Sequence, residues 1–175
     1  MAEKHAVFRS DLMSGTDVAA DLVSLRFYNG TTSSATTVDV DNCVIALLGE
    51  FESTATKTER EIRKASAAAD DSDLKNCVVI ATPEVLYDER KKNLDEFYNE
   101  AGTICRGYRL RQGNIFSVTA DAFASSPASV AIGTALGIGA NGKIATSVGN
   151  GKTTLGYLRA VETTKRYTYY VIEVA

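Results

Sequence analysis

The last third of the chain is rich in glycine, and this feature constrains the fold more than any other. Seven of the thirteen glycines follow residue 126, and Gly137, Gly139 and Gly142 form a G-x-G-x-x-G pattern. Such a pattern binds a dinucleotide only when a helix follows it, because the helix N-terminus then faces the pyrophosphate. Gly149 and Gly151 interrupt the chain before two helical turns can form. We therefore interpret these glycines as turn residues of a β structure.

The Asn141-Gly142 pair lies between two short stretches that alternate in polarity. This arrangement is typical of a β-hairpin with a two-residue type I′ turn, in which both central residues have positive φ. Gly151-Lys152-Thr153 resembles the end of a phosphate-binding loop. Thr146, however, stands where that loop requires its first glycine. The sequence thus predicts a hairpin, followed by a glycine-rich turn before a strand over 154–163.

Composition excludes several broad classes. The chain has 175 residues, 45% of them hydrophobic and 23% charged, which suits one soluble globular domain. Its net charge of −3 argues against a nucleic-acid partner, because non-specific binding requires a basic surface. No apolar run reaches the roughly 18 residues that span a bilayer. The first residues also lack the apolar segment of a secretory signal. We expect neither a nucleic-acid nor a membrane partner.

The residues that usually carry catalysis or bind metals are few and scattered. Cys43, Cys77 and Cys105 are widely spaced beside apolar residues, which predicts buried thiols in a reducing compartment. His5 is the single histidine, and we expect it to lie in a mobile N-terminus. The acidic run 70–73 lacks the ligand spacing of a calcium loop and predicts a solvated turn. We assign no catalytic, cofactor-binding or metal-binding residue, and we expect a non-enzymatic protein without a cofactor.

One helix is predicted over about 84–101. Thr82 can cap it, Pro83 suits its first turn, and Gly102 suits its end; the alternative is a later start near Asp88. Its carboxylates lie three or four residues from lysines, so a salt-bridged solvent face explains them. The apolar residues that recur at helical spacing are Leu94, Phe97, Tyr98 and Ala101.

Overall, the sequence predicts an α+β, mainly β fold of short antiparallel strands and hairpins. It has one main helix and a glycine-rich C-terminal sheet or small barrel. We divide the chain into an N-terminal arm (1–19) and a compact domain (20–175), the latter with an α+β part (20–124) and a β-rich part (125–175). The arm either orders on a partner or is a frayed terminus. The predicted strands are 21–28, 43–51, 61–68, 76–81, 103–111, 114–119, 130–136, 143–148, 154–163 and 165–174.

Three of these segments leave alternatives open. Residues 61–68 show no clear apolar face, and we favour a strand over a helix. The last strand is apolar on both faces, so it lies centrally in a sheet or offers an aromatic face to a partner. The segments 103–111 and 114–119 predict a compact hairpin. The arginines of the first of these segments either contact nucleic acid or face water and acidic neighbours; they are Arg106, Arg109 and Arg111.

Two blocks, Tyr87–Phe97 and Glu100–Thr119, resemble the central segment of head decoration (cement) proteins of tailed bacteriophages. The order of the C-terminal segments is similar too: a Val-x-Ile-Gly strand, an Asn-Gly-Lys hairpin, a Gly-Tyr-Leu strand and a final β-rich segment. The resemblance covers roughly the last half of the chain. It implies a virion protein, synthesised in the host cytoplasm, that binds the major capsid protein on the outer surface of the assembled head and stabilises it without catalysis.

A shell-binding protein would suit the symmetry axes of the shell either as a monomer or as a homo-oligomer, namely a homotrimer. The first interface candidates are then the N-terminal arm and the exposed side of Tyr167–Tyr170. Two other kinds of function stay open. One is another structural or adaptor protein: either a tail or capsid-associated virion component, or an adaptor whose terminal aromatic strand adds to a partner's sheet. The other is a nucleotide-binding enzyme, which requires a helix after Gly142.

Overall fold

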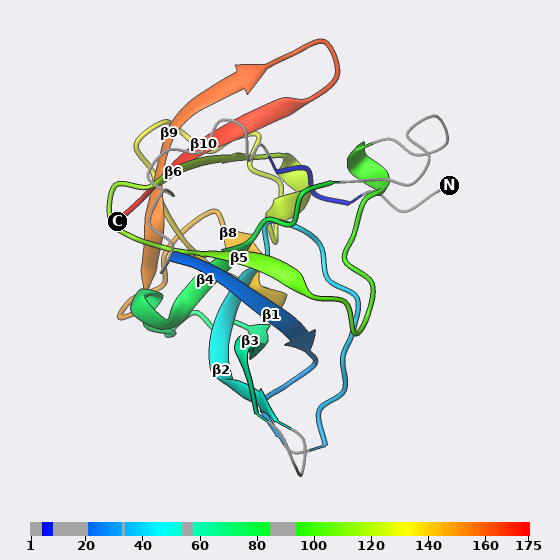
Figure 1. Ribbon diagram of the computed structural model, residues 1–175. Helices are drawn as coiled ribbons and strands as arrows, with labels where there is room; N and C mark the ends of the chain where they lie inside the picture. The colour runs from blue at the N-terminus through cyan, green and yellow to red at the C-terminus, as the bar shows by residue number, and fades with distance from the viewer. Residues whose placement is uncertain (1–4, 9–20, 33, 54–57, 85–93) are drawn as a thin grey trace.

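The computed structural model describes residues 5–8, 21–32, 34–53, 58–84 and 94–175. These residues form two β units packed against each other (Figure 1): a closed barrel of strand order β1-β3-β2-β4-β5, and a five-stranded sheet of order β6-β10-β9-β7-β8. The strands are β1 (Leu22–Tyr28), β2 (Ile45–Ser53), β3 (Thr58–Ala67), β4 (Cys77–Ile80), β5 (Cys105–Arg109), β6 (Ile115–Val118), β7 (Ala135–Ile138), β8 (Ile144–Ala145), β9 (Thr154–Thr163) and β10 (Thr168–Val174).

The prediction of a mainly β fold is confirmed. The helical segments of the described residues are single 3-10 turns, and none of these helices is long and apolar enough to cross a membrane. The segment 61–68, left open between helix and strand, lies in β3 for all but its last residue. The 3-10 turns are η3 (Leu74–Asn76), η4 (Leu94–Glu96), η5 (Ala120–Ala122) and η6 (Ala140–Gly142).

Strand β4 separates two hydrophobic cores, because its side chains alternate between the two sides of the barrel wall. Val78 and Ile80 belong to the core inside the barrel, which also holds Leu25. Cys77 and Val79 belong to the larger core between the barrel and the second sheet. All four residues of β4 are buried. The second sheet contributes most of the larger core, chiefly through Phe116, Val118, Leu136, Ile138, Ile144, Leu155, Leu158, Tyr170, Ile172 and Val174.

The barrel closes through β1, which pairs in parallel with β3 and antiparallel with β5. At the closing pair, a side chain on Gly107 would lie 2.8 Å from Leu25 Cδ2 and 2.9 Å from Val78 Cγ2. Glycine at this position therefore leaves room for the large apolar residues that fill the barrel.

The last strand, β10, lies between β6 and β9. Of the two explanations for its two apolar faces, the structure therefore supports a central position in the sheet. Tyr169 and Tyr170 are both buried. The N-terminal segment continues the sheet beyond β6, where Phe8 forms an antiparallel bridge with Val118. Ala6, Val7 and Phe8 are buried as well, so residues 5–8 of the predicted arm are packed against the compact domain.

The predicted hairpin of 103–111 with 114–119 is wrong. A turn does form, since the Asn114 amide donates to the Arg111 carbonyl (3.0 Å). Beyond it, Asn114 and Gly113 exchange backbone bonds with Val174, and β6 pairs with β10 rather than with β5. The two strands diverge because their apolar residues enter different cores: Cys105 lies inside the barrel, whereas residues of β6 lie in the larger core.

The predicted helix over 84–101 is also not found in the described residues. Its positions 85–93 lie outside them, residues 94–96 form only η4, and the chain then becomes extended. Asn99 forms an antiparallel bridge with Val40, with two backbone hydrogen bonds of 2.9 Å. A helix would break both bonds. Leu94, which was expected on the buried stripe, is 41% exposed.

The Asn141-Gly142 hairpin is confirmed, with a different loop length. Asn141 (φ 57°) and Gly142 (φ 72°) have the positive φ of the predicted turn, and β8 rather than a helix follows. Three residues lie within the loop, because the Gly139 amide donates to the Lys143 carbonyl (2.7 Å). Gly142 also lies against the barrel, and a Cβ there would overlap the carbonyl oxygen of Ile45. The hairpin therefore fixes the contact between the two units.

This close contact predicts that Gly142→Ala destabilises the protein more than Gly151→Ala. Both glycines have positive φ, 72° and 71°, but a Cβ on Gly151 meets no atom within 4 Å. We expect Gly151→Ala to lower the free energy of unfolding by about 1–2 kcal/mol. Gly142→Ala should lower it by about 2–5 kcal/mol, because overlap is added to backbone strain. Urea denaturation measures both, and equal losses would contradict the proposed contact.

Candidate functional site

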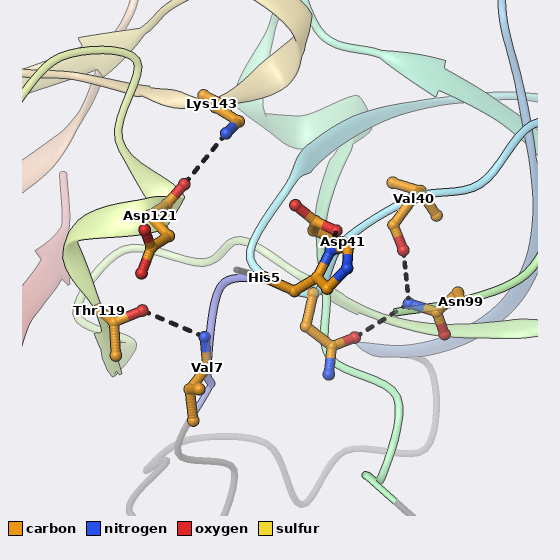
Figure 2. A network of polar contacts seen from close by, with 9 residues as sticks. His5, Val7, Val40, Asp41, Asn99, Thr119, Asp121 and Lys143 are labelled. Atoms are coloured by element: carbon orange, nitrogen blue, oxygen red, sulfur yellow. Dashed lines mark hydrogen bonds and ion pairs between the residues drawn. The ribbon is translucent and has the colours of Figure 1, made fainter. Parts of the chain in front are cut away.

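One groove of the described structure contains His5. It has a volume of about 780 Å³, and its lining includes Asp39, Asp41, Tyr98 and Lys143. His5 Nδ1 lies 2.7 Å from Asp41 Oδ1, and the imidazole ring centre lies 4.9 Å from that of Tyr98. Figure 2 shows His5 and Asp41 facing each other. The sequence placed His5 in a mobile terminus, but here it is anchored.

The backbone of the N-terminal segment positions His5. The Val7 amide donates to Thr119 Oγ1 (3.1 Å), and the Thr119 amide donates to the Val7 carbonyl (3.3 Å). The Phe8 ring stacks on Phe116 with ring centres 6.0 Å apart. The signal for this packing is the apolar run Ala6-Val7-Phe8, which is short but continuous.

Behind His5, two buried asparagines join three separate segments. Asn99 Nδ2 donates to the Val40 carbonyl (3.1 Å) and to Asn42 Oδ1 (3.2 Å). Asn42 Oδ1 also accepts from the Thr82 amide (3.0 Å), and Asn42 Nδ2 donates to the Thr82 carbonyl (2.9 Å). These amides are satisfied within the protein, as buried polar groups generally are. Figure 2 shows the Asn99 part of this network beside His5.

A histidine paired with an aspartate can orient its ring as a general base, but the reaction also needs a nucleophile within reach. In the described part of the chain, no hydroxyl or thiol forms a hydrogen bond with His5. Lys143 Nζ donates to the Asp121 carbonyl (3.1 Å) and is thereby tied to η5. The interactions of this groove hold the N-terminal segment, residues 39–42 and residue 99 together.

The three cysteines are buried free thiols, as predicted. Burial raises the pKa of Cys43 well above 9.0 and raises that of Cys77 and Cys105 to about 11. Thiols in this state are poor nucleophiles at neutral pH. Among the described residues, no group of three or more His, Cys, Asp or Glu side chains lies close enough to hold a metal ion.

The Gly151-Lys152-Thr153 segment binds another part of the protein. Lys152 Nζ forms an ion pair with Asp70 Oδ1 (3.0 Å), and the Thr153 amide donates to the Asp70 carbonyl (2.8 Å). The predicted acidic turn is mostly exposed, and Asp73 accepts a hydrogen bond from the Lys75 amide. These contacts connect the second sheet to the turn between β3 and β4.

The three arginines of the segment 103–111 differ in their contacts. Arg111 donates from Nε and Nη2 to a single oxygen of Asp21, Oδ1, which lies 2.6 Å from each nitrogen. Arg109 Nη1 donates to the Lys75 carbonyl (3.3 Å). Arg106 is exposed on β5. For Arg111, the predicted acidic neighbour is therefore confirmed.

The aromatic segment Tyr167–Tyr170 offers little free surface. Tyr169 and Tyr170 are buried, and Tyr167 is half-buried, with burial raising its pKa. The exposed part of this hairpin lies further out: Arg159 and all residues from Val161 to Arg166 are exposed. In Figure 1 the β9–β10 hairpin (orange and red) projects from the rest of the molecule.

No protein-family model, curated protein or solved structure matches this chain. The function proposed below therefore rests on the chain's own residues and on the resemblance to decoration proteins described above.

The buried amide network predicts that Asn99→Ala lowers the free energy of unfolding by about 1–3 kcal/mol, because the Val40 carbonyl and Asn42 Oδ1 lose a donor in a buried site. Asn29→Ala is the matched control. Its amide bonds to Thr36 are exposed, so water replaces them and the loss should stay below about 1 kcal/mol. Chemical denaturation of both variants gives the comparison. A larger loss for Asn29→Ala would show that the buried network contributes little.

The raised thiol pKa values predict that the native protein reacts slowly with a thiol reagent such as Ellman's reagent at pH 8. All three cysteines should react rapidly once guanidinium unfolds the chain, because unfolding exposes Cys43, Cys77 and Cys105 and restores ordinary pKa values. Absorbance of the released chromophore counts the reacted thiols. Rapid reaction of one full equivalent in the native protein would contradict the burial.

Proposed function

We propose that this chain is a bacteriophage capsid decoration protein. It binds the outer surface of the assembled head and stabilises it through protein–protein contacts, without catalysis. The resemblance of Tyr87–Phe97 and Glu100–Thr119 to decoration proteins supports the proposal, although residues 87–93 lie outside the described structure. The structural observation that carries it is the β9–β10 hairpin, which projects from the rest of the molecule (Figure 1) and exposes the residues from Val161 to Arg166.

The hairpin has the properties of a contact surface. Val161 is 43% exposed near its end, among charged and polar neighbours. Closer to the core, Arg159 Nε of β9 donates to Glu173 Oε2 of β10 (2.6 Å). This salt bridge connects the two strands and stiffens the hairpin. A stiff element loses little conformational entropy when it binds, so more of the contact energy appears as affinity.

The interior of the protein supports the same role. His5, Asn42 and Asn99 use their polar groups to join distant segments, so they act as parts of a rigid body. The nucleotide-binding alternative required a helix after Gly142, and β8 occupies that place. A capsid presents many equivalent sites, and contacts across several subunits can multiply a modest affinity at each one.

The proposed partner is the major capsid protein. Either a monomer or a homotrimer at a symmetry axis of the shell would suit binding to this partner. The proposed location is the outer capsid surface of the virion, after synthesis in the host cytoplasm.

The proposal predicts saturable binding of the purified chain to undecorated heads of the phage that encodes it. Co-sedimentation measures the binding, and the temperature of head disruption should rise, because a ligand of the assembled state stabilises that state. Heads saturated beforehand with unlabelled protein are the control and should take up no more. A particle reconstruction should place the density on the outer shell.

Two results would contradict the proposal. One is the absence of both binding and stabilisation by folded protein. The other is density confined to the tail or to the inside of the head, which would indicate a different structural role in the virion.

A further inference from the structure

The barrel has one outward side that does not contribute to the larger core. Along β1, Leu25 and Phe27 point into the barrel, so Ser24 and Arg26, which alternate with them, point outward. The register places outward residues of the neighbouring strands beside them. In Figure 1, β1 runs across the front of the barrel. We define the basic face as this surface, made up of Leu22, Ser24, Arg26, Ile62, Lys64 and Arg106.

Pairing across the strands gathers three cations on the basic face. Lys64 of β3 is the partner of Arg26, and Arg106 of β5 is the partner of Ser24, which is next but one to Arg26. Lys64 and Arg106 are exposed, and the Arg26 side chain is 28% exposed. These positions are far apart in sequence, so the concentration of charge is a product of the fold.

The carboxylates around this face are largely occupied or turned away. Glu52 lies 4.0 Å from Arg26 but is only 8% exposed, and it accepts a hydrogen bond from the Tyr28 hydroxyl (2.6 Å). Asp21 is 2% exposed and is paired with Arg111. Glu61 is exposed but alternates with Ile62 along β3, so it is not an outward residue of the basic face. Glu50, by contrast, is exposed and lines the same groove as Lys64. The basic face thus brings three cations, Arg26, Lys64 and Arg106, against the carboxylates of Glu50 and Glu52 beside it, on a chain whose net charge is −3.

Apolar side chains accompany the cations. Leu22 is 39% exposed at the start of β1, and Ile104, next to β5, is 50% exposed. Ile62 of β3, which pairs with Ser24 of β1, is half-exposed. Arginine together with apolar groups is typical of the central part of a protein–protein interface, whereas a surface that only contacts solvent carries mixed charges.

We propose that the basic face is a second docking surface, in addition to the β9–β10 hairpin, and that it contacts an acidic patch of the capsid shell. The inference rests on the proposed function and assigns this contact to particular residues. The basic face attracts an acidic partner, while the net negative charge of the whole chain disfavours approach through its acidic sides. Charge complementarity thus selects the orientation, and Leu22, Ile62 and Ile104 supply the apolar area.

The test compares two double variants in binding to undecorated heads. Lys64→Glu/Arg106→Glu reverses two exposed charges on the basic face. Lys75→Glu/Lys152→Glu is the matched control, because it reverses two exposed charges outside both the basic face and the β9–β10 hairpin and changes the net charge by the same amount. Thermal unfolding establishes that both variants are folded. Should the first variant unfold, Lys64→Gln/Arg106→Gln replaces it.

We expect the basic-face variant to bind at least about tenfold more weakly than the unaltered protein, because like charges would then oppose each other across the contact. The control should stay within about twofold. Unchanged binding by the basic-face variant, or an equal or greater loss in the control, would overturn the inference while leaving the proposed function intact. Failure of the unaltered protein to bind heads would instead overturn the proposed function.

Discussion

The burial of β4 on both sides is the constraint on which the rest of the structure depends. Val78 and Ile80 fill the barrel, and Cys77 and Val79 complete the core against the second sheet. Burying each such aliphatic side chain contributes about 1.5–3 kcal/mol. Because one strand supplies both cores, displacing it exposes both at once. The two β units are thus coupled through shared strands as well as through their contact surface, and Gly142 against Ile45 sets how closely they approach.

Local sequence signals predicted several elements well. The unbroken apolar run Cys-Val-Val-Ile predicted β4, and residues 154–163 form β9 as predicted. Asn141-Gly142 forms its hairpin because the turn depends on the backbone preferences of those two residues. The failures concern partners. The turn at Arg111–Asn114 has the same local chemistry whether the next strand returns to β5 or crosses to β10, and the core that each strand enters decides between them.

Long-range bonds also explain why the candidate site was only partly predictable. A helical pattern over 94–101 loses to the pairing of Asn99 with Val40, which lies 59 residues away. His5 looked mobile because Asp41 and Tyr98, which hold it, are distant in sequence. Likewise, Arg106 was visible as part of a basic cluster, but its neighbours Arg26 and Lys64 join it only through the strand register.

The seating of the N-terminal segment has a consequence for the order of folding during synthesis. Val7 bonds to Thr119, 112 residues further along the chain, and β6 beside it requires β10 at the C-terminus. Residues 5–8 therefore cannot complete their packing until β6 and β10 have been synthesised. Such distant pairings slow folding and expose apolar segments meanwhile. We infer that the barrel can close earlier and that the second sheet, with residues 5–8 on its edge, is completed only once β10 is available.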